Sequence, residues 1–218
     1  MRLLSVNVGR PRPVEWNGGV VMTSIWKHAV DGPVRAARTN LAGDEQSDLS
    51  VHGGPEKAVY AYPSEHYASW SDELRVVDLP WGAFGENLTT EGLSETEVRV
   101  GDRLQIGTAE FLVTQPRLPC FKLALRLDRA DIIQRFVRRN RPGFYLAVAR
   151  EGVVQAGDRI QVVSGSPNSV TVADVAALRN GLVDDEGLMR RAIEAPGLSE
   201  GWRAHFRARL GGGGIPTL

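Results

Sequence analysis

The first 165 or so residues of the sequence are divided into short apolar segments, separated by clusters of Gly, Pro and Asp. Segments rich in β-branched and aromatic residues, such as LLSVNV, VVMTSIW, AEFLVTQ and FYLAVA, favour β-strands. A six-residue motif occurs twice with conservative changes, as GDRLQI at 101–106 and as GDRIQV at 157–162. In both copies Gly-Asp favours a turn, and the next residues alternate between polar and apolar. We predict that the copies begin two equivalent strands of a β-barrel, whose closure removes exposed edges.

Two helices are expected between these strands. The first begins at Pro63 and continues through SEHYASWSDEL, with the proline in the first turn and Glu65 near the positive end of the helix dipole. The second covers DRADIIQRFVRRN, where the apolar residues of 132–137 share one face and the arginines lie opposite. The segment 78–92, DLPWGAFGENLTTEG, shows no periodicity, so we expect a long ordered loop there.

The character of the chain changes after Pro167. Thr171 is followed three residues later by Asp174, a weak form of the capping box that begins a helix. Two further segments, DDEGLMRRAIE and SEGWRAHFRARL, place their apolar residues on one helix face. We therefore predict a mainly β, α+β fold: a mixed β-barrel domain at 1–166 and a small three-helix domain at 167–211. The glycine-rich tail at 212–218 is expected to be disordered.

The charges and the single cysteine exclude several classes of function. Acidic and basic residues balance at 26 each, which predicts neither a nucleic acid polymer nor a membrane surface as a partner. One cysteine excludes an internal disulfide and a four-cysteine zinc site, and the four histidines are scattered. No signal peptide or membrane-spanning run is visible, so a reducing cytoplasm is the expected location.

The one cysteine, Cys120, lies in the segment TQPRLPCFKL and is the strongest candidate for chemistry. Pro116 and Pro119 fix the backbone and remove two N–H donors, so Cys120 is not expected in a regular strand. Arg117 and Lys122 nearby favour a thiolate, the form that attacks electrophiles or binds soft metals. A lone cysteine can equally be a small buried apolar residue.

Three other segments have both a structural and a functional interpretation. Lys27, Arg35 and Arg38 are expected near strand ends, where they either form a solvated face or bind an anion. The turn at 52–55, His-Gly-Gly-Pro, is either a plain turn or one whose N–H groups bind an anion. Asn87 in FGENL either caps a turn or offers a donor and an acceptor to a heterocycle.

Taken together, these motifs resemble a known family. GDEQSDLSVHGGPEKAVYAYPSEHY, FGENLTTEGL, VRVGDRLQIG with VTQPRLPC, GFYLAV and AGDRI occur in the order expected of a MOSC domain, the molybdenum cofactor sulfurase C-terminal domain. The resemblance covers about residues 15–165. The segments at 170–210 resemble the small C-terminal domain of a bacterial branch. That branch is similar to proteins that detoxify N-hydroxylated bases such as 6-hydroxylaminopurine.

The resemblance implies a β-barrel that binds the pyranopterin molybdenum cofactor, with Cys120 as the metal ligand and the catalytic residue. It implies that Lys27 and Arg117 meet the phosphate of the cofactor, and that His52 and Asn87 touch the pterin or shape the pocket. Three further residues fall in segments expected at the same cofactor site: Arg35, Gly53 and Gly54.

The implied activity is reduction of small N-hydroxylated compounds to amines. Because no flavin or nicotinamide fingerprint is visible, electrons are expected from a separate flavoprotein reductase. Two alternatives use the same residues. One is a carrier of cofactor or sulfur without turnover, and the other is a metal-free thiol enzyme with Cys120 as nucleophile and His52 as base. The final helices could also serve a homodimer.

Overall fold

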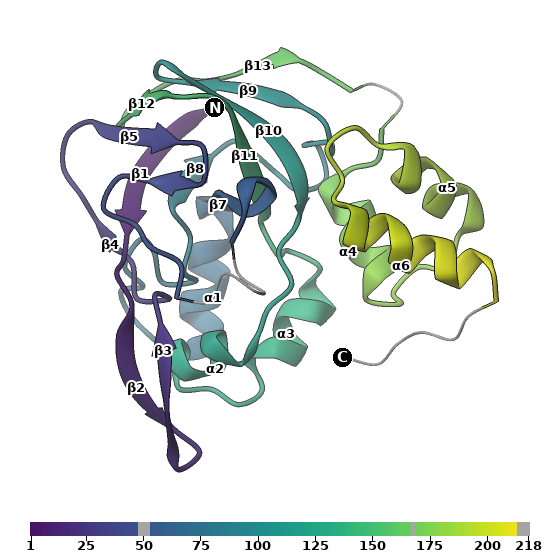
Figure 1. The fold of residues 1–218 in the computed structure, drawn as a ribbon. Helices are drawn as coiled ribbons and strands as arrows, with labels where there is room; N and C mark the ends of the chain where they lie inside the picture. The colour runs from purple at the N-terminus through teal and green to yellow at the C-terminus, as the bar shows by residue number, and fades with distance from the viewer. Residues whose placement is uncertain (48–52, 167–168, 213–218) are drawn as a thin grey trace.

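A mixed β-sheet that curls into a barrel forms the larger part of the chain (Figure 1), in a computed structural model that describes residues 1–47, 53–166 and 169–212. Neighbouring strands are antiparallel except β7 and β8, which run parallel. In spatial order the strands are β13 (Ile160–Ser164), β9 (Arg103–Ile106), β10 (Ala109–Pro116), β11 (Phe144–Arg150), β7 (Val59–Pro63), β8 (Leu88–Glu91), β1 (Arg2–Val8) and β4 (His28–Ala29).

The barrel closes where the start of β1 meets the start of β13. Arg2 and Arg159 form an antiparallel bridge, and the amides of Leu3 and Ile160 donate to carbonyls of the opposite segment at 2.9 and 3.0 Å. The two copies of the repeated motif lead into β9 and β13, which pair directly with Ile106 opposite Ile160. The prediction of two equivalent barrel strands is confirmed, and the two strands are also neighbours.

Two smaller sheets flank the barrel. The hairpin of β2 (Arg12–Trp16) and β3 (Gly19–Thr23) projects beyond the end of the barrel (Figure 1). A three-stranded sheet contains β12 (Gly152–Val154), β5 (Val34–Ala37) and β6 (Asn40–Leu41). The chain between β3 and β6 therefore connects the two small sheets.

The expectation of one long loop at 78–92 was wrong for its last part. Residues Leu88–Glu91 form β8, which pairs with β7 on one side and β1 on the other. Leu88, Thr89 and Thr90 are all buried, because both faces of this strand are covered. A strand buried on both faces has no alternation of polar and apolar residues, which is why the sequence pattern did not reveal it.

Helices cover one open end of the barrel. After the short turn η1 (Pro55–Lys57), the predicted helix at Pro63 starts as a 3-10 turn, η2 (Ser64–His66), and continues as α1 (Tyr67–Leu74). The second predicted helix is α3 (Ile132–Arg139), which buries Ile132 and Phe136. A further helix that the pattern did not predict, α2 (Phe121–Leu127), begins directly after Cys120. Trp70 of α1 stacks on Phe136 with ring centroids 4.7 Å apart.

Three short helices follow at the C-terminal end, as predicted: α4 (Val172–Arg179), α5 (Glu186–Glu194) and α6 (Glu200–Leu210). Their shared core contains Met189, Trp202 and Phe206, and it also takes in Val100 and Leu118 from the barrel side. The disordered tail was predicted at 212–218, and residues 213–218 of it lie outside the part of the chain that the structure describes. No helix among the described residues is long and apolar enough to cross a membrane.

The capping box predicted at Thr171 is present, and it generates a stability prediction. The Thr171 hydroxyl accepts from the Asp174 amide, and the Asp174 carboxylate accepts from the Thr171 amide, each at 3.0 Å. We expect Thr171→Ala to lower the free energy of unfolding by about 1 kcal/mol, because the half-buried helix start loses a hydrogen-bond partner. Thr171→Ser keeps the hydroxyl and should lose less. Urea unfolding of the three proteins measures the difference, and equal midpoints would contradict it.

Candidate functional site

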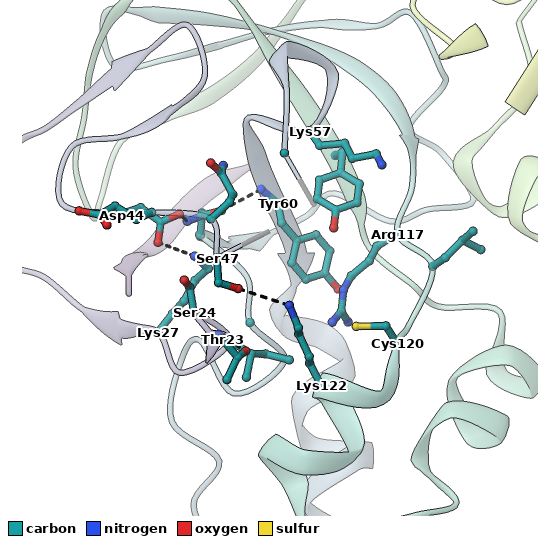
Figure 2. Close-up of a pocket in the computed structure, with 18 residues that line it drawn as sticks. Thr23, Ser24, Lys27, Asp44, Ser47, Lys57, Tyr60, Arg117, Cys120 and Lys122 are labelled. Carbon is teal, nitrogen blue, oxygen red and sulfur yellow. Dashed lines mark hydrogen bonds and ion pairs between the residues drawn. The ribbon is translucent and has the colours of Figure 1, made fainter. Parts of the chain in front are cut away.

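A pocket opens at the end of the barrel where six segments of the chain meet (Figure 2). Its walls come from residues 23–27 at and after the end of β3, residues 44–47 and 53, the η1–β7 segment, the loop before β8, the segment from β10 into α2, and Tyr145 of β11. The cavity that these walls enclose has a volume of about 100 Å³. Four cations line it against two carboxylates: Lys27, Lys57, Arg117 and Lys122, with Asp44 and Glu45.

Cys120 lies on the pocket wall, as predicted outside the strand ladder. Pro116 is the last residue of β10, where it pairs with Phe144. Cys120 then has an extended backbone and is the N-cap residue of α2, with its carbonyl accepting from the Leu123 amide at 2.9 Å. The thiol is partly exposed, and its sulfur points towards the Arg117 guanidinium (Figure 2). The helix start therefore fixes the backbone of Cys120 while its side chain faces the pocket.

Arg117 is a buried cation with spare hydrogen-bonding capacity. Its guanidinium lies over the ring of Tyr60, 4.9 Å from the centroid, and the residue is 6% exposed. Its Nη1 has no hydrogen-bond partner among the described residues. Ser24, 8% exposed on the opposite wall, has an unpartnered hydroxyl as well. Buried polar atoms without partners are rare, so their presence in a pocket wall points to a polar, acceptor-rich ligand.

Lys27, which the resemblance places at the phosphate of the cofactor, lines the pocket with its amine paired within the protein. Lys27 Nζ donates to the carboxylate of Asp44, and both side chains are buried. Asp44 also accepts from the Gly9 amide at 2.8 Å and from Asn87 Nδ2 at 2.9 Å. Much of the positive charge of Lys27 is thus balanced inside the wall of the pocket.

Asn87 organises the wall instead of presenting free amide hydrogens to it. Its Nδ2 donates to Asp44 and, at 3.2 Å, to the carbonyl of Asn7, while its Oδ1 accepts from the Tyr60 amide at 3.1 Å. Both amide hydrogens are therefore used within the protein. Of the two roles expected for Asn87, the contacts favour shaping the pocket.

The remaining predicted site residues are Gly53, Gly54, Arg35 and His52, and the structure does not bring all of them to the pocket. Gly53 lines the pocket, and Gly54 follows it with φ 89° at the start of η1. Arg35 lies on β5 away from the pocket, where its exposed guanidinium binds Glu151 at 2.8 Å. The structure therefore does not bring Arg35 to the other candidates. His52 lies outside the described residues.

The comparisons with known proteins assign the fold. A family model described as the MOSC domain matches residues 48–161, and one described as the YiiM-like, 3-alpha helix domain matches residues 170–213. Protein YiiM of Escherichia coli (strain K12) is 38% identical over 195 residues, which cover 87% of this chain and 86% of that protein. The chain belongs to the MOSC domain family.

Two further similarities extend this assignment. The crystal structure of YiiM from Geobacillus stearothermophilus matches with a TM-score of 0.79 at 32% identity, covering 96% of this chain and 98% of that one. A protein named Reductase from Gibberella moniliformis is 37% identical over 166 residues, which are 74% of this chain and 29% of that protein. MOSC domains are associated with molybdenum cofactor binding.

Several residues of this MOSC pocket were missed as site residues in the sequence. They include Ser24, Asp44, Lys57, Tyr60, Lys122 and Tyr145. One signal was available: the sequence holds three lysines against 23 arginines, and all three lysines line the pocket. For Asp44 and the tyrosines no comparable signal exists, since they come from segments that meet only in the folded chain.

Glu86 of the FGENL motif is a further missed residue, and it lies behind the MOSC pocket wall. Its carboxylate is fully buried and accepts from Tyr67, from the amides of Gly82 and Phe84 at 2.8 and 3.1 Å, and from Thr89 at 3.0 Å. Burial raises the pKa of Glu86, and the hydrogen bonds oppose that rise. This carboxylate holds the loop that leads into Asn87.

This network predicts that Glu86→Gln destabilises the protein by about 3 kcal/mol, because the amide nitrogen that replaces one carboxylate oxygen cannot accept a hydrogen bond and would face a donor in a buried site. Glu45→Gln makes the same chemical change at an exposed position and should cost less than about 0.5 kcal/mol. Thermal and urea unfolding measure both. A Glu86→Gln protein as stable as Glu45→Gln would show that the carboxylate does not hold the loop.

Proposed function

We propose that this MOSC protein binds the molybdenum cofactor in the described pocket and reduces N-hydroxylated compounds to amines. Its electrons would come from a separate flavoprotein reductase. The observation that carries the proposal is the juxtaposition of a partly exposed thiol, Cys120, with a buried guanidinium, Arg117, that has an unpartnered donor. The oxidoreductase-type role of the reductase relative supports the reaction class.

The donor set of the pocket fits the cofactor. A pyranopterin phosphate is an anion rich in acceptors, and the pocket offers an excess of cations with free donors at Arg117 and Ser24. A thiolate is the side chain that soft or high-valent metals prefer. When bound, the cofactor would supply the two-electron redox centre that the side chains of this chain lack.

The residues of the chain have distinct tasks in this proposal. Cys120 would hold the metal, from a backbone that the start of α2 fixes. Arg117 would bind the phosphate through the unpartnered Nη1, while its stacking on Tyr60 holds the guanidinium plane in place. Lys122, whose amine lies 3.3 Å from Ser47 Oγ, would add a second cation on the α2 side of the pocket.

The first test is metal content. Protein made in a host that synthesises the cofactor should hold about one molybdenum atom per chain, as one thiolate ligand implies. Cys120→Ser should lose most of that metal while keeping the wild-type circular dichroism spectrum, because the side chain is partly exposed. Elemental analysis of both proteins decides the ligand assignment. Equal molybdenum in the two would exclude Cys120 as the ligand.

The second test is a matched pair of arginine variants. Arg117→Met should remove cofactor binding and, with it, reduction of 6-hydroxylaminopurine in the presence of a flavoprotein reductase. Arg35→Met makes the same change at a guanidinium outside the pocket and should leave both unchanged. Adenine formation is followed by chromatography. A wild-type protein that holds the cofactor and forms no amine would favour a carrier over an enzyme.

A further inference from the structure

The lysines of this chain are concentrated at one place. The sequence has 23 arginines and three lysines, and Lys27, Lys57 and Lys122 all line the pocket. Arginine stays protonated under all ordinary conditions, whereas a buried lysine loses its proton readily. All the ammonium side chains of this chain, as distinct from its guanidinium groups, therefore lie at the pocket.

Lys27 is held in place by an ion pair and by close packing of the neighbouring backbone. It is 8% exposed, and its amine contacts the Asp44 carboxylate at the pocket wall (Figure 2). Asp44 is held by the Gly9 amide and by Asn87. A Cβ on residue 9 would lie 2.6 Å from the Trp26 carbonyl, so only glycine allows the backbone to come this close. Lys122, in comparison, contacts a serine hydroxyl at 3.3 Å.

The charges around Lys27 act in opposite directions. Burial lowers the pKa of Lys27, while Asp44 and, behind the wall, Glu86 raise it. Across the pocket lie six further titratable or charged side chains, which are Glu45, Lys57, Tyr60, Arg117, Lys122 and Tyr145, together with Cys120. The net direction for the pKa of Lys27 is downward. An ammonium of this kind releases its proton more easily than an exposed lysine does.

The proposed reaction needs such a proton. Converting an N-hydroxyl compound to an amine breaks the N–O bond, takes up an electron pair and two protons, and releases water. The electrons come from the reduced flavin of the reductase, which is oxidised. One proton must reach the departing oxygen and the other the nitrogen.

We propose that Lys27 donates one of these protons and that Asp44 is the positioning residue that holds its amine. This inference rests on the proposed function. It assigns different tasks to the two walls of the pocket: Cys120 and Arg117 hold the cofactor, and Lys27 serves the substrate.

The first experiment needs no cofactor. Protein labelled with 13C and 15N in lysine gives three side-chain signals, which Lys→Arg variants assign. We expect the Lys27 signal of the apo-protein to titrate at lower pH than those of an unfolded control. In Asp44→Asn it should titrate lower still, because the carboxylate that stabilises the ammonium is gone. A Lys27 that titrates like an exposed lysine would overturn the proposal, whatever the activity of the wild type.

The second experiment uses the cofactor-loaded protein. Lys27→Arg keeps the positive charge beside Asp44 but cannot donate a proton, so kcat should fall roughly a hundredfold with molybdenum content unchanged. Lys57→Arg makes the same change at another pocket lysine and should have a smaller effect. An equal loss in the two variants, or full activity in Lys27→Arg, would overturn the assignment to Lys27.

The pH profile separates positioning from a purely structural role. Lys27 donates only while it is protonated, so kcat should fall as pH rises through its pKa, and Asp44→Asn should move this fall to lower pH. A variant that is merely less stable would lower kcat without moving the profile. Absence of any N-hydroxyl reduction by loaded wild-type protein would instead refute the proposed function, and the lysine titration would still report on Lys27 by itself.

Discussion

A carboxylate that is buried away from water needs hydrogen-bond donors around it. Glu86 is such a carboxylate, and the geometry of the pocket wall depends on the donors that surround it. Satisfying Glu86 requires the hydroxyl of Tyr67, two amides of the 82–84 turn and Thr89, which fixes the loop between α1 and β8. That loop places Asn87, and Asn87 in turn holds Asp44 and the backbone of Tyr60. Residues of the pocket wall that are far apart in sequence are thus positioned through one buried anion.

The electrostatics of the site are local. The chain as a whole carries no net charge, yet the pocket gathers four cations from three segments of the chain. Two of them are treated differently by their surroundings: Arg117 keeps an unpartnered donor, whereas the charge of Lys27 is balanced by Asp44. An anionic ligand is therefore attracted most strongly to the side of the pocket next to the cysteine. The attraction is weaker at the opposite wall, where Asp44 offsets the charge of Lys27.

The sequence allowed the barrel and most helices to be predicted, because their evidence is periodic and local. The repeated GDR motifs mark strands that pair with each other, and Thr171 with Asp174 marks a real helix start. β8 was missed because both its faces are buried, and Arg35 was grouped with Lys27 by sequence proximity alone. The partners of Lys27 and Asn87 could not be predicted, since hydrogen bonds between Gly9, Asp44 and Asn87 exist only once three separate segments have converged.

Leu118 lies on the pocket loop between Arg117 and Pro119. Its side chain packs against the core of the C-terminal helices. The three helices therefore act as an anchor for the loop that carries the cysteine. Local opening of α4–α6 without unfolding of the barrel would release that anchor. Under the proposed function, retention of the metal would then report on the integrity of a helical region that does not itself provide the thiolate.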